Sequence, residues 1–171
     1  TLEQACAAVA VCFYIAVSFT AVILLSDLPG TGKYTYLLIF FTAWSTDSFA
    51  YFTGMAFGKH KLIVEVSPKK TVEGAIGGIV ACVLAFIVFA LIGAHFDPDI
   101  VPNYPILIIG AVFSSIIAQA GDLLMSAIKR SRNIKDFGKI FPGHGGILDR
   151  FDSAIAVAIS ILFIEIWTDL L

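Results

Sequence analysis

GDLLMSAIKRSRNIKDFGKIFPGHGGILDRFDS, residues Gly121 to Ser153, interrupts an otherwise apolar sequence with charge. The chain has 11 basic and 13 acidic residues, and ten of these 24 lie in this stretch. Apolar runs long enough to cross a bilayer flank it on both sides. The pattern predicts a polar loop that joins two membrane helices at a membrane surface.

The composition of the whole chain favours the bilayer as its solvent. Hydrophobic residues make up 58% of the chain and charged residues 14%, whereas about 25% of a soluble protein is charged. Loops that contain glycine, proline or charge separate five apolar segments: Ala5 to Leu25, Tyr34 to Phe57, Gly74 to His95, Ile106 to Ile128 and Phe151 to Leu171. The sequence therefore predicts an all-α, polytopic integral membrane protein with about five transmembrane helices.

The 171 residues are enough for one helical bundle, so we expect residues 1–171 to form a single membrane-embedded domain. Cys6, Cys12 and Cys82 lie in apolar runs without the paired spacing of a metal site, and we interpret them as small apolar side chains. No nucleic-acid-binding surface is indicated. The chain begins at Thr1, which we interpret as a start inside a longer protein whose N-terminal helices precede this sequence.

The distribution of Lys and Arg predicts the orientation in the membrane. Ten of the 11 basic residues fall in two loops, four between the second and third apolar segments and six between the fourth and fifth. Basic loops remain on the cytoplasmic side, and alternation of five spans puts these two loops on the same side. We therefore expect the polar stretch and the N-terminal end of the chain to face the cytoplasm.

Three carboxylates at this surface indicate a metal site. Asp122, Ser126 and Lys129 share one face of a helix, and Asp149 and Asp152 share a face of the next. A carboxylate near hydrocarbon costs about 2.5 to 3.5 kcal/mol unless it pairs, binds an ion or lines a wet cavity. Oxygen ligands without a Cys and His cluster favour a hard cation, so the prediction is Mg²⁺ held by the three aspartates, with room for a second cation.

The basic residues among these carboxylates are suited to bind phosphate. The candidates are Lys129, Arg130, Lys135 and Arg150. Alternatively, such residues only anchor a helix end to anionic headgroups, which does not explain the interleaved aspartates. His144 lies in the glycine-rich segment. It is either a general base or a hydrogen-bond donor to phosphate, or it is a structural or solvated residue.

Two upstream features are candidates for the same site. The segment SPKKTVEGAIGG offers Ser67, Lys69 and Lys70 to anionic oxygens, although Ser67 and Glu73 are also typical of a helix start. Asp47 lies in the middle of an apolar segment, where a carboxylate is either functional or held by neighbouring hydroxyl groups.

The stretch SAIKRSRNIKDFGKIFPGHGGILDRFD resembles the signature of the phosphatidate cytidylyltransferases, also called CDP-diglyceride synthases. The segments WSTDSFAYFTGMAFGKHKL and SPKKTVEGAIGG are similar to two upstream blocks of that family. The resemblance covers roughly the whole chain and corresponds to the C-terminal part of longer family members. It implies a membrane-embedded catalytic domain in a multi-pass protein of the bacterial inner membrane.

The resemblance implies that CTP and phosphatidic acid react, with Mg²⁺ assistance, to give CDP-diacylglycerol and pyrophosphate. The aspartates above would organise the metal, and Lys129, Arg130, Lys135 and Arg150 would hold phosphates. Asp136 is either a ligand or a partner for a basic residue, while His144, Ser67, Lys69 and Lys70 are secondary candidates for substrate binding. The attacking lipid phosphate is already ionised, so the reaction does not demand a protein general base.

Two other classes of membrane protein fit this charge pattern less well. A transporter or channel would spread its polar residues through the depth of the bilayer, whereas here the basic charge gathers at one face. A CDP-alcohol phosphotransferase carries a denser run of spaced aspartates than this chain has. Besides CTP, phosphatidic acid and membrane lipids, the glycine-rich helices are compatible with a homodimer as a partner.

Overall fold

The computed structural model describes residues 2–138, 145–168 and 170–171. Five long helices account for most of the described chain: α1 (Leu2–Ser26), α2 (Leu37–Phe57), α3 (Val72–Phe96), α4 (Tyr104–Ser131) and α5 (Leu148–Thr168). A short 3₁₀ helix, η1 (Gly30–Tyr34), leads from α1 into α2. The predicted all-α class and the five predicted segments are confirmed.

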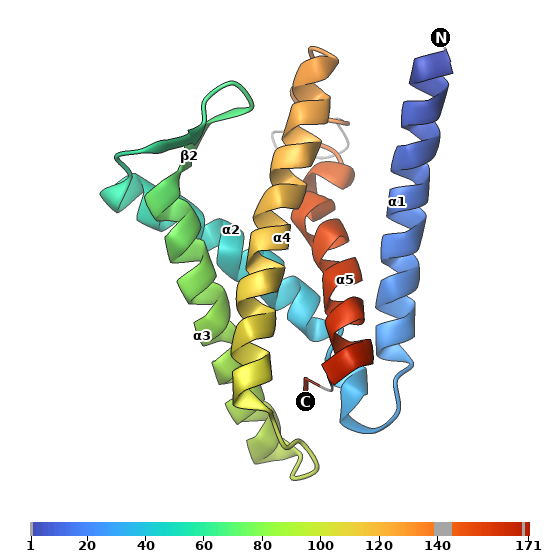
Figure 1. Cartoon of the computed structure of the whole chain (residues 1–171), viewed down its shortest axis with the longest axis vertical. Helices are drawn as coiled ribbons and strands as arrows, with labels where there is room; N and C mark the ends of the chain where they lie inside the picture. The colour runs from blue at the N-terminus through green and yellow to red at the C-terminus, as the bar shows by residue number, and fades with distance from the viewer. Residues whose placement is uncertain (1, 139–144, 169) are drawn as a thin grey trace.

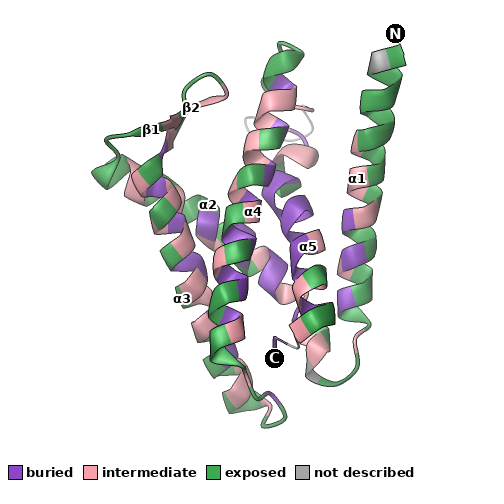
Figure 2. Cartoon of the chain, in the orientation of Figure 1, coloured by how far each residue is buried: buried purple, intermediate pink, exposed green. Residues whose placement is uncertain are grey.

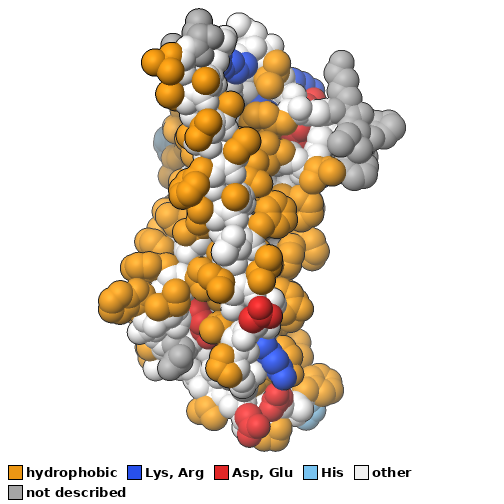
Figure 3. All heavy atoms as spheres, turned by 90° about the vertical axis from the view of Figure 1, so that its right-hand side faces the viewer, with side chains coloured by type: hydrophobic (Ala, Val, Ile, Leu, Met, Phe, Trp, Pro, Cys, Tyr) orange, Lys and Arg blue, Asp and Glu red, His pale blue; other side chains and the backbone are white. Residues whose placement is uncertain are grey.

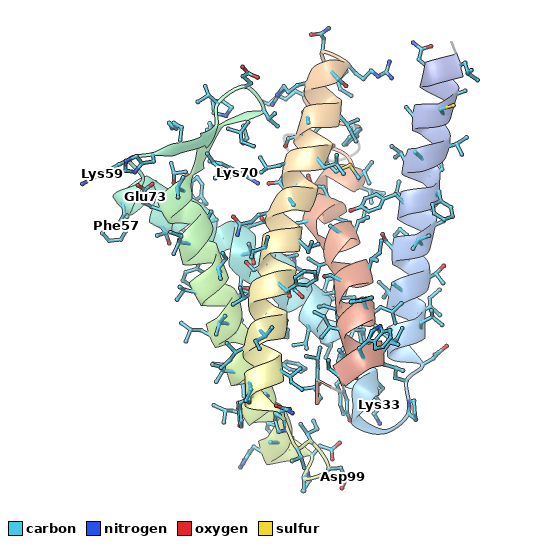
Figure 4. All side chains as sticks on the ribbon, viewed as in Figure 1. Lys33, Phe57, Lys59, Lys70, Glu73 and Asp99 are labelled. Atoms are coloured by element: carbon cyan, nitrogen blue, oxygen red, sulfur yellow. The ribbon has the colours of Figure 1, made fainter. Side chains whose placement is uncertain are left out.

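The helices run alternately up and down, so that the two basic loops lie at one end of the bundle (Figure 1). The N-terminal end of α1, the loop between α2 and α3 and the loop between α4 and α5 share this end, which we call the basic end. Figure 4 shows Lys59 and Lys70 there, whereas Lys33 and Asp99 lie at the opposite end. The alternation predicted from the sequence therefore holds.

Helix α2 differs from the other four helices in hydropathy and in direction. In the described part of the chain, four helices are long and apolar enough to cross a membrane: Gln4–Ser26, Val72–Phe96, Tyr104–Ser131 and Leu148–Thr168. Helix α2 is not among these four, since Ser45, Thr46, Asp47 and Ser48 interrupt its apolar residues. It runs obliquely behind α4 from one end of the bundle to the other (Figure 1).

A small antiparallel hairpin, β1 (Lys61–Ile63) and β2 (Ser67–Thr71), follows α2 at the basic end. Of the two readings that the sequence left open for Ser67, the helix start does not hold, because Ser67 lies in β2, whereas Glu73 does lie in the first turn of α3. Thr71 is the N-cap of α3, and its Oγ1 accepts a hydrogen bond from the Gly74 N–H at 3.1 Å. An N-cap side chain satisfies a backbone donor that the first helical turn leaves open, so the helix begins where the strand ends.

Glu73 fixes the turn that leads into this hairpin. Its carboxylate accepts hydrogen bonds from the backbone N–H groups of Lys59 and His60 at 3.1 and 3.2 Å, and it contacts His60 Nδ1 at 2.6 Å. The end of α2 is thereby tied to the first turn of α3. Strand β2, which carries Lys69 and Lys70, packs against α2 and α3.

Small residues let the helices approach closely. A Cβ on Gly74 would lie 2.5 Å from the Ala50 carbonyl oxygen of α2, and a Cβ on Gly121 would lie 2.5 Å from the Ala156 Cβ of α5. Buried residues follow the facing sides of α4 and α5, whereas α1 is mostly exposed (Figure 2). Glycine at these two positions therefore lets neighbouring helices pack closely.

The surface is typical of a protein surrounded by lipid. Figure 3, which views the molecule from the α1 side, shows hydrophobic side chains along its length and charged groups gathered toward the two ends. Many large apolar side chains are exposed, including Phe13, Phe19 and Ile23 on α1. Contiguous apolar surface of this kind suits contact with lipid tails or with further helices.

Candidate active site

The last turns of α4 bring Lys129 into contact with two carboxylates of α5. Its Nζ donates a hydrogen bond to Asp149 Oδ1 at 2.9 Å and lies 3.8 Å from Asp152 Oδ2. The three side chains are only 10%, 5% and 12% exposed, respectively. The Lys129 ammonium also lies 5.3 Å from the centre of the Phe137 ring. A buried cation is therefore held between two buried anions.

Asp149 organises the chain on both sides of the glycine-rich turn. Its Oδ2 accepts hydrogen bonds from the backbone N–H groups of Phe137 at 2.8 Å and Gly146 at 2.9 Å. Gly145, which precedes Gly146, has a φ of 82°, in the left-handed region that favours glycine. Together with Lys129, these donors engage both oxygens of Asp149, so the carboxylate holds the Lys129 ammonium and the backbone at Phe137 and Gly146 in place.

Asp152 and Asp47 lie beside this pair. Asp152 Oδ1 accepts a hydrogen bond from the Ser153 N–H at 3.0 Å, and the Ser153 hydroxyl donates to Asp47 Oδ2 at 2.9 Å. Asp152 also interacts electrostatically with Asp122 and Asp47. The position of Asp47 was left open by the sequence, and the structure joins it to the start of α5.

A second ion pair lies where the hairpin meets α4. Lys70 Nζ is 2.5 Å from Asp122 Oδ2, and the Ser126 hydroxyl donates to Asp122 Oδ1 at 3.5 Å. Lys70 points from the hairpin toward α4 (Figure 4). The predicted proximity of Asp122 and Ser126 is confirmed, whereas Lys129, on the same helix, pairs with α5 instead.

A cavity of about 410 Å³ adjoins the second ion pair, between α2, α3, α4 and the hairpin. Its polar lining consists of Asp47, Tyr51, Lys61, Lys69, Lys70, Thr71, Gln119 and Asp122. Asp47 interacts electrostatically with both Asp122 and Lys70. Asp47 and Asp122 therefore line the cavity and also interact electrostatically with Asp152, which lies beside Lys129.

The three predicted metal ligands do not form a ready coordination sphere. Within residues 2–138, 145–168 and 170–171, no group of three or more His, Cys, Asp and Glu side chains is close enough to hold a metal ion. Asp149 is engaged by three donors, while Asp122 and Asp152 each contact a lysine. The role of these aspartates as metal ligands stays a prediction.

The remaining predicted residues lie around these ion pairs or outside the described chain. Arg130, Lys135, Asp136 and Arg150 are exposed, with Arg130 in the last turn of α4 and Arg150 in the first turn of α5. Arg130 Nη1 donates to the Ile134 carbonyl oxygen at 3.4 Å. In β2, Lys69 is exposed and Ser67 is half-buried. His144 lies outside the described residues.

The sequence of the chain is similar to known cytidylyltransferases. The model of the cytidylyltransferase family matches residues 1–167. The chain is 45% identical over 134 residues to a phosphatidate cytidylyltransferase of Bacillus subtilis, covering 77% of this chain and 48% of that protein. It is 40% identical over 141 residues to the protein of that name in Rickettsia felis, covering 82% of this chain and 62% of the relative.

A third relative is the phosphatidate cytidylyltransferase of Haemophilus influenzae, which is 44% identical over 132 residues. The match covers 75% of this chain and 44% of that protein. The chain thus spans about half the length of the curated relatives it matches.

Proposed function

The chain belongs to the cytidylyltransferase family, and on this premise we propose that its basic end is the site where CTP and phosphatidic acid form CDP-diacylglycerol and pyrophosphate. The relatives named phosphatidate cytidylyltransferase support these substrates. A soluble nucleotide and a membrane lipid can meet only at a membrane surface. The four apolar helices and the polar groups at one end suit such a meeting.

The observation that carries the proposal is the pairing of two lysines with three aspartates, where one of the pairs, Lys70 with Asp122, lines a polar cavity. Lys70 pairs with Asp122, and Lys129 lies between Asp149 and Asp152. Buried charges are costly unless they are paired. A site that balances cations and anions in this way can exchange its internal pairs for contacts with phosphate and a cation.

In the proposed reaction, an oxygen of the lipid phosphate attacks the α-phosphorus of CTP in line. A new P–O bond forms between the two phosphates, and the bond from the α-phosphorus to the bridging oxygen of pyrophosphate breaks. The electron pair leaves with pyrophosphate, and no proton transfer is required. The work of the protein is to bring four phosphate groups together against their repulsion.

The basic residues would divide this task by position. Lys129 is buried and fixed by its carboxylates, which suits it to hold a phosphate at the reacting centre. Lys69 and Lys70 line the polar cavity and would hold the other substrate's phosphates. The exposed Arg130, Lys135 and Arg150 would draw anionic substrates toward the site.

Asp122 and Asp152 fit a hard cation better than Asp149 does. Asp122 and Asp152 have carboxylate oxygens with free lone pairs beyond their present contacts, whereas Asp149 is occupied by three donors. We therefore propose that Asp122 and Asp152 hold Mg²⁺ and that Asp149 positions Lys129 and the backbone at Phe137 and Gly146. Bound Mg²⁺ would neutralise phosphate charge and stabilise the leaving pyrophosphate.

The excess of Lys and Arg at the basic end supports a cytoplasmic orientation. CTP is a cytoplasmic nucleotide, so this orientation also agrees with the proposed substrates. Since the named relatives are bacterial proteins, we propose that the chain lies in the bacterial inner membrane.

The proposal is tested by incubating the purified protein with labelled CTP and phosphatidic acid. We expect labelled CDP-diacylglycerol with Mg²⁺ present and none after chelation. Asp152→Asn should lower the rate at least 100-fold, because it removes a carboxylate that faces both Lys129 and Asp122.

Asp99→Asn is the matched control, since Asp99 is an exposed aspartate at the opposite end of the bundle. This variant should retain wild-type turnover. Undiminished product formation by Asp152→Asn, or by the wild type without divalent cations, would contradict the assigned roles.

A further inference from the structure

An apolar groove opens between α4 and α5 on the side that faces α1. Its volume is about 580 Å³, and its walls are Tyr14, Phe113, Ile117, Ala120, Gly121, Leu124, Ala156, Ile159, Ser160 and Phe163. Most of these side chains are apolar, and Phe113, Leu124 and Phe163 are exposed. We call it the α4–α5 groove.

One end of the α4–α5 groove adjoins the candidate active site. Gly121 directly precedes Asp122, and Ala156 lies one helical turn below Asp152. Tyr14, at the same end, interacts electrostatically with Asp152. The apolar groove therefore ends next to residues that neighbour Asp122 and Asp152 on the same helices.

We propose that the α4–α5 groove binds an acyl chain of the lipid substrate, so that its phosphate reaches Lys129. From Leu124 to Phe113 the groove follows α4 for about 16 Å, at 1.5 Å per residue. This length covers about half of a hydrocarbon core about 30 Å thick. The inference rests on the proposed function, because it assigns a place to one of the two proposed substrates.

A larger apolar groove, of about 1270 Å³, lies between α2 and α3 but suits this lipid less well. Its end toward the basic loops is lined by Glu73, a carboxylate that would repel a phosphate and that already pairs with His60. Gly74 and Ala50, which are in close contact, line the polar cavity but not this groove. The α4–α5 groove has no carboxylate in its lining and ends near Asp122 and Asp152, so it suits the lipid substrate better.

In a membrane, lipid tails are as apolar as the groove, so the chain gains little affinity from burial alone. The groove acts by position: it fixes the lipid so that its phosphate lies at the reacting centre. Misplacement by about 1 Å can cost about 100-fold in rate. Blocking the groove should therefore lower turnover of long-chain lipids while leaving the nucleotide site intact.

Ala120 offers the place to block it, because this exposed side chain lines the groove and is not among the residues assigned to the site. Ala120→Phe should lower kcat/KM for long-chain phosphatidic acid at least tenfold. The KM for CTP, and turnover of dihexanoyl phosphatidic acid, should remain within twofold. Ala85→Phe, in the larger groove, is the matched control and should behave as wild type.

Photolabelling locates the chain without relying on activity. A phosphatidic acid with a diazirine in its acyl chain should label residues 113–124 and 156–163, and unlabelled phosphatidic acid should compete. Ala120→Phe should lower this labelling at least fivefold. Labelling spread evenly over all lipid-facing helices, or absent because another protein helix covers the groove, would overturn the inference.

The two proposals can fail separately. Product formation with labelling elsewhere would overturn the groove and leave the proposed function intact. Competed labelling of the groove in a protein that forms no CDP-diacylglycerol would support the lipid site and overturn the proposed function.

Discussion

Replacing Lys129 with Met tests whether the buried ion pairs hold α4 against α5. The variant keeps the length and apolar stem of the side chain but leaves Asp149 and Asp152 without their buried cation. Removing one partner of a buried pair costs about 3 to 5 kcal/mol. Asp149 retains its two backbone donors. We therefore expect the free energy of unfolding to fall by about 3 kcal/mol, the lower end of this range.

For a chain of this size, about 1 kcal/mol corresponds to about 2 to 4 °C in Tm. The Lys129→Met variant should therefore melt about 6 to 12 °C below the wild type. The measurement is thermal unfolding in detergent followed by the fluorescence of Trp44 and Trp167, the two tryptophans of the chain. Lys135→Met removes an exposed lysine and should shift Tm by less than about 2 °C.

A double variant, Lys129→Met with Asp149→Asn, separates the ion pair from a general loss of packing. If the cost arises from an unpaired charge, the two substitutions together should destabilise less than the sum of the single effects, by at least about 1.5 kcal/mol. Additive effects, or a Lys129→Met variant that melts within 2 °C of the wild type, would refute the reasoning.

Two further predictions concern the elements around the site. Thr71→Val removes the N-cap hydroxyl of α3 and should lower the unfolding free energy by about 0.5 to 2 kcal/mol. Thr71→Ser keeps the hydroxyl and should keep the stability of the wild type. Equal Tm values for the two variants in thermal unfolding would contradict the capping role. Gly121→Ala places a Cβ against Ala156 and should cost about 1 to 3 kcal/mol in thermal unfolding, and adding Ala156→Gly should recover most of it. Failure of the second substitution to restore Tm would show that the close approach of α4 and α5 is not the cause.

The candidate site could be predicted from the sequence in its composition but not in its pairing. The helical period places Asp122 and Lys129 on one face, and the structure does bring Asp122 against Ser126. The helical period does not predict that Lys129 turns toward α5, because this contact depends on the distance between two helices that are separated by a loop. Nor does the sequence reveal that Lys70, in a different loop, pairs with Asp122.

Asp47 shows the same limit from the other direction. A carboxylate in an apolar segment signals a function or a hydrogen-bond partner, and the sequence offered only its neighbours Ser45, Thr46 and Ser48 as partners. The actual partner is Ser153, 106 residues away. A contact over such a separation exists only once α2 crosses behind the bundle and meets the start of α5.

The hairpin between α2 and α3 was missed for a local reason. Its strands are short, and Ser67, Pro68 and Glu73 are residues that also begin helices. Glu73 binds the turn at Lys59 and His60, so the hairpin depends on contacts that close over 14 residues. Such a contact has no periodic signal in the sequence.

The apolar composition, the five helices and the gathering of basic loops at one end of the bundle could all be predicted from the sequence, because the lengths of apolar runs and the placement of Lys and Arg are properties of the chain alone. Only the packing of the helices in space shows which lysine pairs with which aspartate, how α2 crosses the bundle and where an apolar groove forms between α4 and α5. These features depend on how closely the helices approach one another, and a buried charge takes as its partner the opposite charge that helix packing brings within reach.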